Sequence, residues 1–126
     1  MNGFSFDSNI LIDALAGYGP ANVEIQRAFD QHGRGWISRM VWIEVLSKGN
    51  PSACRQSELL LSGFQIDEID VDISARAAAL RRERARLKSA DAIILASAQL
   101  RGRTLITRNI RDFPVDTPGV RIPYLV

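Results

Sequence analysis

Short apolar runs alternate with longer segments of helical pattern along most of this chain, and that alternation limits the folds it can adopt. Runs such as GFSF at 3–6 and WIS at 36–38 indicate short buried strands. The segments between such runs favour helix and reach glycine where a helix would end, as at Gly17 and Gly33. Strands separated by helices indicate βαβ crossovers. We therefore expect an α/β protein with a mainly parallel sheet that is covered on both faces.

The expected elements follow one another in this alternating order. Strands are predicted at 3–6, 36–38, 64–66 (or as far as Ile69), 104–107 and, more weakly patterned, 120–122, which gives four to five strands. Helices are predicted at 10–16, 20–32, 40–47, 51–61, 72–87 and 90–100, with Ser89 as the cap of the last. The 126 residues suffice for one domain with a full apolar core, and no internal repeat is evident.

Four acidic residues stand where an apolar run meets a turn or inside an apolar helix. They are Asp7, Glu44, Asp91 and Asp112. A carboxylate beside apolar surface is costly unless it is paired or binds a cation. Ligands of open parallel sheets bind beyond the carboxyl ends of the strands, so we expect these acids to converge there. Carboxylates suit Mg²⁺ or Mn²⁺, and such an ion can activate water for attack on phosphorus.

Each acid also has an ordinary structural explanation. Asp7 can cap the helix that follows it, and Asp91 can favour the positive end of a helix dipole. Asp112 can be a turn residue, and Glu44 can form a buried pair with an arginine. The expected convergence of all four acids favours a metal site over four separate explanations.

Charge is unevenly distributed along the chain, although the net charge is only +2. Residues 58–72 contain acids without any Lys or Arg, whereas residues 76–111 contain ten basic residues and two acids. One region of the surface should therefore be positive, which suits a polyanion such as nucleic acid. Alternatively, the arginine-rich segment is a solvated helix, forms a dimer surface, or pairs with the acidic 67–72 segment.

Other catalytic classes find little support in the sequence. His32 is the only histidine and Cys54 the only cysteine, so a histidine-based triad, a zinc site and an intrachain disulfide are not expected. There is no glycine-rich phosphate loop. A phosphotransfer domain is not expected either, because Asp7 is not followed by a second Asp two residues later, and no acid pair or C-terminal catalytic lysine is evident. The N-terminus lacks a signal-peptide pattern, so a cytoplasmic location is expected.

Four short motifs, taken in order, resemble those of a known family. They are Asp-Ser-Asn at 7–9, Glu44 inside an apolar helix, SADAIILA at 89–96 and TRNIRDF at 107–113. Together they are similar to PIN-domain ribonucleases, and among these to VapC-type toxins of bacterial toxin–antitoxin pairs. The resemblance covers essentially the whole chain, residues 1–126, as a single PIN-like domain.

The resemblance implies a three-layer α/β/α sandwich, an endoribonuclease activity that depends on Mg²⁺ or Mn²⁺, and a homodimer. It also implies a cognate VapB-like antitoxin whose tail covers the active cleft. The first three acids of the family match Asp7, Glu44 and Asp91, which are expected to hold the metal. The fourth is placed at Asp112, with Asn109 as a polar helper.

Polar and basic residues around the acids complete the expected site. The supporting residues are Ser8, Asn9, Ser38, Thr107 and Asn109, with Ser8 standing where the family often has Thr. The residues expected to contact RNA phosphates are Arg82, Arg86, Arg108 and Arg111. The alternative function is a non-catalytic PIN-like module that binds RNA or protein through its basic surface. The presence of all four acids favours the ribonuclease.

Overall fold

The computed structural model of the protein describes residues 3–125, and within them every expected strand and helix is present. The strands are β1 (Phe4–Phe6), β2 (Trp36–Ser38), β3 (Gln65–Asp67), β4 (Thr104–Ile106) and β5 (Val120–Arg121). The helices are α1 (Ser8–Leu15), α2 (Gly19–His32), α3 (Arg39–Leu46), α4 (Pro51–Leu61), α5 (Val71–Glu83) and α6 (Ser89–Leu100). Met1, Asn2 and Val126, which complete the expected 1–126 domain, lie outside the described residues.

The five strands form one parallel sheet in the order β3-β2-β1-β4-β5. The chain first moves outward from β1 through β2 to β3, and then crosses back to β4 on the other side of β1. In register, Ser5 of β1 lies between Trp36 of β2 and Leu105 of β4. Strand order therefore reverses between β1 and β4, and the carboxyl ends of these two strands mark the switch point of the sheet.

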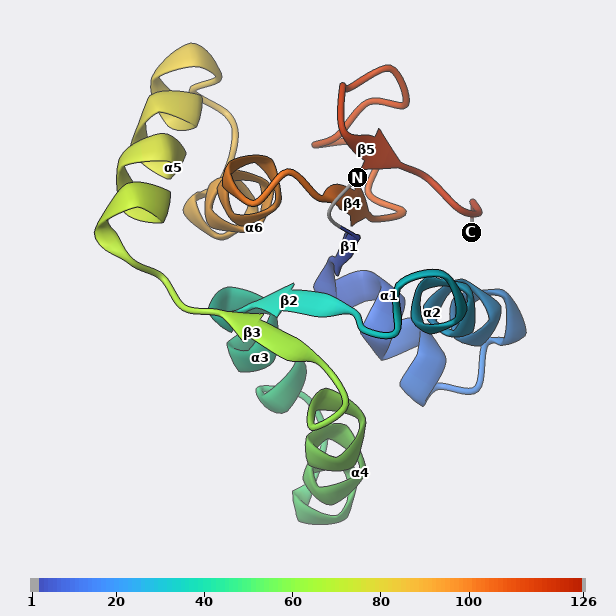
Figure 1. Ribbon diagram of the computed structural model, residues 1–126. Coiled ribbons are helices and arrows are strands. Elements are labelled where there is room, and N and C mark those ends of the chain that lie inside the picture. Colours follow the sequence, from blue (N-terminus) through green and yellow to red (C-terminus); the bar gives the residue numbers. More distant parts are fainter. Residues whose placement is uncertain (1–2, 126) are drawn as a thin grey trace.

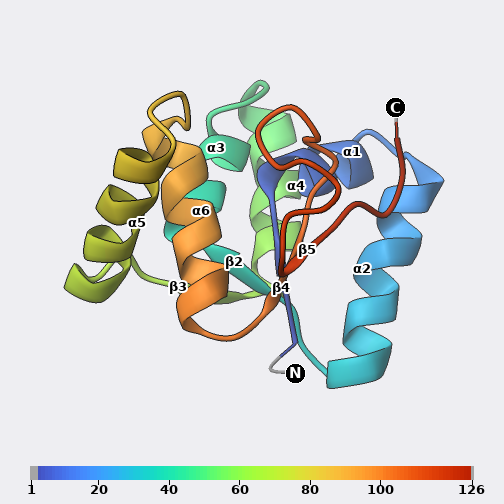
Figure 2. The ribbon, with the colours of Figure 1, turned by 90° about the horizontal axis from the view of Figure 1, so that it is seen from above.

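Helices cover both faces of the sheet, which confirms the expected α/β/α sandwich. Helices α1–α4 lie on one face, whereas α5 and α6 lie on the other (Figures 1 and 2). This division follows from the strand order, because crossovers are right-handed. Connections that run in one direction along the sheet keep their helices on one face, and the reversed connection places its helices on the opposite face.

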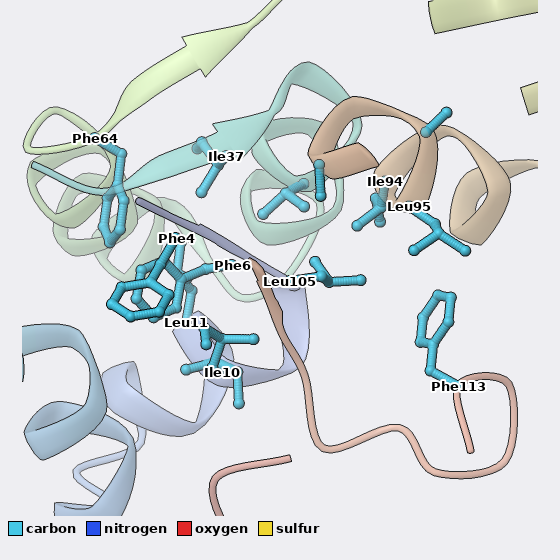
Figure 3. Packing of buried hydrophobic residues seen from close by; sticks show 14 of the residues in the cluster. Phe4, Phe6, Ile10, Leu11, Ile37, Phe64, Ile94, Leu95, Leu105 and Phe113 are labelled. Atoms are coloured by element: carbon cyan, nitrogen blue, oxygen red, sulfur yellow. The ribbon is translucent and has the colours of Figure 1, made fainter. Parts of the chain in front are cut away.

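The core continues through the sheet from one helical layer to the other. Strand β1 is buried along its whole length, and Phe4 and Phe6 lie close to Leu11 of α1 (Figure 3). On the other face, Phe113 points toward Leu95 of α6 (Figure 3). Phe113 is fully buried, so the turn that carries it is fixed on α6.

The turn between α5 and α6 differs from the sequence prediction. Helix α5 ends at Glu83 instead of continuing to Leu87, and Ser89 is the first residue of α6 rather than its cap. Leu87 is buried in the turn, where its carbonyl accepts a hydrogen bond from Arg81 Nε at 2.9 Å. The need to reverse direction and to bury Leu87 therefore overrides the helix propensity of the arginine- and alanine-rich sequence.

Among residues 3–125, no helix is long and apolar enough to cross a membrane.

Candidate active site

The candidate site lies at the switch point of the sheet, where β1 and β4 end. Asp7 directly follows β1, and Thr107 directly follows β4. Because these strands are neighbours in parallel register, their next residues are brought together. Thr107 Oγ1 donates a hydrogen bond to Asp7 Oδ2 at 2.7 Å across 100 positions of sequence.

Asp7 is held in one orientation by hydrogen bonds to both carboxylate oxygens. Oδ1 accepts a bond from the Ser8 backbone N–H at 2.8 Å, and Oδ2 accepts a second bond from Asn9 Nδ2 at 3.1 Å. The side chain is only 3% exposed, and this burial raises its pKa in spite of the hydrogen bonds. Asp7 is also the N-cap of α1, so the capping explanation is correct and coexists with the position at the switch point.

Ser8 connects Asp7 to Glu44 of α3. The Ser8 hydroxyl donates to Glu44 Oε1 at 3.0 Å. Burial is the main cause that raises the pKa of Glu44, and the nearby charge of Asp7 adds to it, whereas Ser8 and Lys48 oppose it. No arginine pairs with Glu44 in the part of the chain that the structure describes, so the arginine-pair explanation is wrong.

Asp91 approaches the same point from the opposite layer, in the first turn of α6. Its pKa is raised to about 6, first by burial and then by the negative charges of Asp7, Asp112 and Glu44. Lys88 opposes the shift. Asp7, Asp112 and Glu44 therefore all lie within electrostatic range of Asp91.

Asp112 is fixed by the turn that follows β4. Asn109 Nδ2 donates to Asp112 Oδ2 at 2.9 Å, and the Asp112 backbone N–H donates to Asn109 Oδ1 at 3.2 Å. The Arg84 guanidinium donates to the backbone carbonyl of Asp112, which ties this turn to the one between α5 and α6. The turn explanation of Asp112 is therefore correct, and the turn places its charge near enough to contribute to the raised pKa of Asp91.

Two further supporting residues, Thr107 and Ser38, act directly and indirectly on the acids. Thr107 Oγ1 also accepts the backbone N–H of Asn109 at 3.0 Å, so one hydroxyl orients both Asp7 and the Asp112 turn. Ser38 is buried at the end of β2 and caps α3 by accepting the Met40 backbone N–H at 3.1 Å. Ser38 thus supports the site indirectly, by fixing the start of the helix that carries Glu44.

The donors of the site are carboxylate, hydroxyl and amide oxygens, which suit a hard cation such as Mg²⁺ or Mn²⁺. Within residues 3–125, however, no group of three or more His, Cys, Asp or Glu side chains is arranged so that it could hold a metal ion. Mg²⁺ usually keeps several of its waters and binds through one or two carboxylates, so an open acidic site of this kind fits it. The assignment of Asp7, Glu44 and Asp91 as metal ligands stays a prediction.

The basic residues divide into exposed and paired ones. Arg82, Arg86 and Arg111 are exposed. Arg108 instead forms an ion pair with Asp13 of α1, at 2.6 Å from Nε and 3.1 Å from Nη2. Sequence analysis did not single out Asp13, because nothing along the chain connects it to a residue 95 positions away.

Three of the four acids in the 67–72 segment pair with arginines outside α5. Arg39 pairs with Glu68, Arg101 pairs with Asp70 at 3.1 Å, and Arg103 pairs with Asp67 at 2.5 Å. The prediction that the arginines of the 76–88 segment could serve this purpose finds no support in these pairings.

Comparison with known proteins agrees with this geometry. A sequence model of the PIN domain matches residues 5–115. The chain belongs to the PIN-domain family. Comparison with curated proteins gives no match. A solved toxin–antitoxin complex from Klebsiella pneumoniae is 40% identical, with a TM-score of 0.83, and the alignment covers 97% of this chain and 98% of that one.

Two more distant structures share this PIN fold. VapBC from Salmonella typhimurium, bound to DNA, is 24% identical with a TM-score of 0.75, over 97% of each chain. FitAcB from Neisseria gonorrhoeae is 18% identical with a TM-score of 0.78, over 98% of this chain and 99% of that one. The resemblance to PIN domains seen in the sequence motifs is therefore confirmed.

Proposed function

We propose that this PIN-domain protein is the VapC-type toxin of a toxin–antitoxin pair and acts in the cytoplasm as a divalent-metal-dependent endoribonuclease. The observation that carries the proposal is the group of four acids at the switch point, three of which have raised pKa values. Groups of the same charge that are brought together in a partly buried site are costly without a cation. Such sites are therefore typical of metal-assisted chemistry.

Asp7, Glu44 and Asp91 would hold the ion, which would supply an activated water and stabilise the leaving oxygen of a phosphodiester. Thr107, Asn9 and Ser8 hold the Asp7 carboxylate by hydrogen bonds, which would limit its movement when it binds the ion. Asp112 and Asn109 would lie at the rim of the site. The basic residues Arg82, Arg86 and Arg111 would contact RNA phosphates on either side of the cleavage point.

The proposed protein partner is a VapB-like antitoxin whose tail covers the active cleft. Support comes from the relative that is 40% identical, whose structure is described as a toxin–antitoxin complex. The homodimer implied by the resemblance stays a prediction.

The first test replaces one acid at a time and measures RNA cleavage. Asp7→Asn and Asp91→Asn should lower kcat by at least about 100-fold, since each removes a charge that holds the ion. Asp72→Asn is the matched control, because Asp72 is an exposed acid in the first turn of α5. A chelator should abolish cleavage by the wild type, and Mg²⁺ or Mn²⁺ should restore it.

Cleavage that persists in the chelator would contradict the metal-dependent mechanism. A wild-type protein that binds RNA without cutting it at any divalent-ion concentration would support the non-catalytic module instead.

A further inference from the structure

The C-terminal segment of the chain lies beyond the part matched to the PIN domain, yet it returns to the site. After β5, the chain runs back beside α1 and α2 (Figures 1 and 2). The Tyr124 ring packs edge-to-face against the ring of Tyr18, with 5.1 Å between their centroids. The matched residues are 5–115, so the family assignment gives no role to Tyr124.

Tyr124 contacts the acid that holds Arg108. Its hydroxyl donates to Asp13 Oδ2 at 2.8 Å, and the same oxygen accepts Arg108 Nε at 2.6 Å. Burial opposes ionisation of Asp13, but the bonds from Arg108 and Tyr124 outweigh it and lower the pKa of Asp13. Burial and the bond to Asp13 raise the pKa of Tyr124, so the hydroxyl stays a proton donor. The three groups therefore form a stable charge-assisted network.

This network continues into the active site through the backbone of Arg108. The Arg108 N–H donates to Asn9 Oδ1 at 3.3 Å, and Asn9 Nδ2 donates to Asp7 Oδ2 at 3.1 Å. Asn9 Nδ2 also lies 3.3 Å from Thr107 Oγ1. The side chain of Asn9 is thus held between the residue that follows β4 and the carboxylate that follows β1.

We propose that Asp13 and Tyr124 are positioning residues, which anchor Arg108 so that Asn9 and Thr107 hold the Asp7 carboxylate in its reactive orientation. The proposal rests on the function given above, in which Asp7 binds the catalytic ion. The C-terminal segment then helps to position the active site. Residues that orient a ligand through hydrogen bonds commonly affect activity by about 10-fold or more, even without touching substrate.

Tyr124→Phe tests the proposal with a minimal change, because it removes the hydroxyl and keeps the ring on Tyr18. Tyr18→Phe is the matched control, since the Tyr18 hydroxyl has no hydrogen-bond partner among residues 3–125. Tyr124→Phe should lower kcat for an RNA oligonucleotide by about threefold to tenfold with KM unchanged, which is less than for a direct partner of a ligand because Tyr124 acts through Asp13 and Arg108. Tyr18→Phe should leave both constants unchanged.

A second measurement follows the hydrogen bonds directly. In nuclear magnetic resonance spectra of the metal-free protein, the Asn9 side-chain amide and Arg108 Nε signals should shift in Tyr124→Phe and stay in place in Tyr18→Phe. Asp13→Asn should shift them further, and the kcat loss of the double variant should be less than the product of the single losses, because both residues act through one network.

The outcomes separate this proposal from the proposed function. If the wild type cleaves RNA and Tyr124→Phe has the same kcat, the positioning role is wrong while the ribonuclease assignment stands. If Tyr124→Phe loses kcat and thermal stability together without moving the Asn9 signal, Tyr124 is only a packing residue. A wild type that never cleaves RNA overturns the proposed function, and the positioning role falls with it.

Discussion

At the scale of single residues, hydrogen bonds lower the pKa values of the Asp7 and Glu44 carboxyl groups in the site, whereas burial raises them. Asp7 accepts four hydrogen bonds or close polar contacts, from Ser8, Asn9 and Thr107, and its pKa is still raised. Asp91 has fewer compensating groups. Its pKa reaches about 6, because the charges of the other three acids add to the effect of burial. The carboxylates therefore destabilise the metal-free fold when ionised, and a bound cation would relieve this cost.

Asp91→Asn should accordingly stabilise the metal-free protein in a pH-dependent way. Folding raises the pKa of Asp91 from its ordinary value of 3.8 to about 6, so the native protein binds the proton more tightly than the unfolded chain does. The resulting cost is absent below the lower value and complete above the higher one. Near pH 8, Asp91→Asn should therefore raise the free energy of unfolding by about 1 kcal/mol, after allowance for solvent screening of this half-exposed group.

Urea denaturation with a chelator, at about pH 4 and about pH 8, measures this difference. The variant and the wild type should be nearly equal at the lower pH. Equal stability at both values would show that folding does not raise the pKa of Asp91.

At the scale of secondary-structure elements, β1 is the strand that carries the site. One of its buried polar side chains, Ser5, lacks a hydrogen-bond partner among the described residues. Phe4 and Phe6 face the helical layer that contains α1, so strand alternation directs Ser5 to the layer of α6. Ser5 is 3% exposed, and its hydroxyl has no hydrogen-bond partner among the described residues. A buried hydroxyl without a partner is destabilising.

Ser5→Ala should therefore raise the free energy of unfolding by about 1 kcal/mol, because it removes an unpaired polar group from the core. Ser38→Ala is the contrasting control, since the Ser38 hydroxyl caps α3, and its loss should cost about 1 kcal/mol. Thermal or urea denaturation measures both changes. A destabilised Ser5→Ala would mean that this hydroxyl has a partner, such as a buried water.

The elements show which parts of the fold local sequence can predict. Strands β1 and β4 and their flanking acids follow from short apolar runs. The expectation that ligands bind beyond the carboxyl ends of the strands correctly placed Asp7 at this edge, whereas Thr107, which bonds to Asp7, was suggested only by the family resemblance. The end of α5 at Glu83 was not predicted. Helix propensity depends on local sequence and does not indicate that Leu87 is buried in a turn. The contacts of Asp13 with Arg108 and Tyr124 could not be predicted either, since only the folded chain brings these residues together.

At the scale of the whole molecule, some arginines pair with the acidic 67–72 segment, whereas others form no ion pair with a described residue. Asp67, Glu68 and Asp70 of the acidic segment pair with Arg103, Arg39 and Arg101. Arg82 and Arg86, by contrast, are exposed near the turn that leads to Asp91, and they form no ion pair with a described residue. Positive charge is therefore left free on the side of the molecule that carries the acids, where a polyanion would have to bind.

RNA binding should consequently depend on salt through these arginines. With a chelator present, so that the RNA stays intact, the affinity for single-stranded RNA should fall steeply as salt rises. The double variant with Arg82→Gln and Arg86→Gln should flatten the log–log slope by about 1.4, which is about 0.7 for each lost phosphate contact. Arg34→Gln with Arg55→Gln is the matched control, because both residues are exposed and lie away from the turn between α5 and α6.

Sedimentation of the same variants tests the other explanation of the arginine-rich segment. RNA contact predicts a flatter salt slope with an unchanged oligomeric state, whereas a role in assembly predicts dissociation with unchanged RNA affinity per subunit. If the control pair flattens the slope as much as the test pair, binding depends on net charge alone. The free arginines beside the acids would then have no special role in holding RNA at the site.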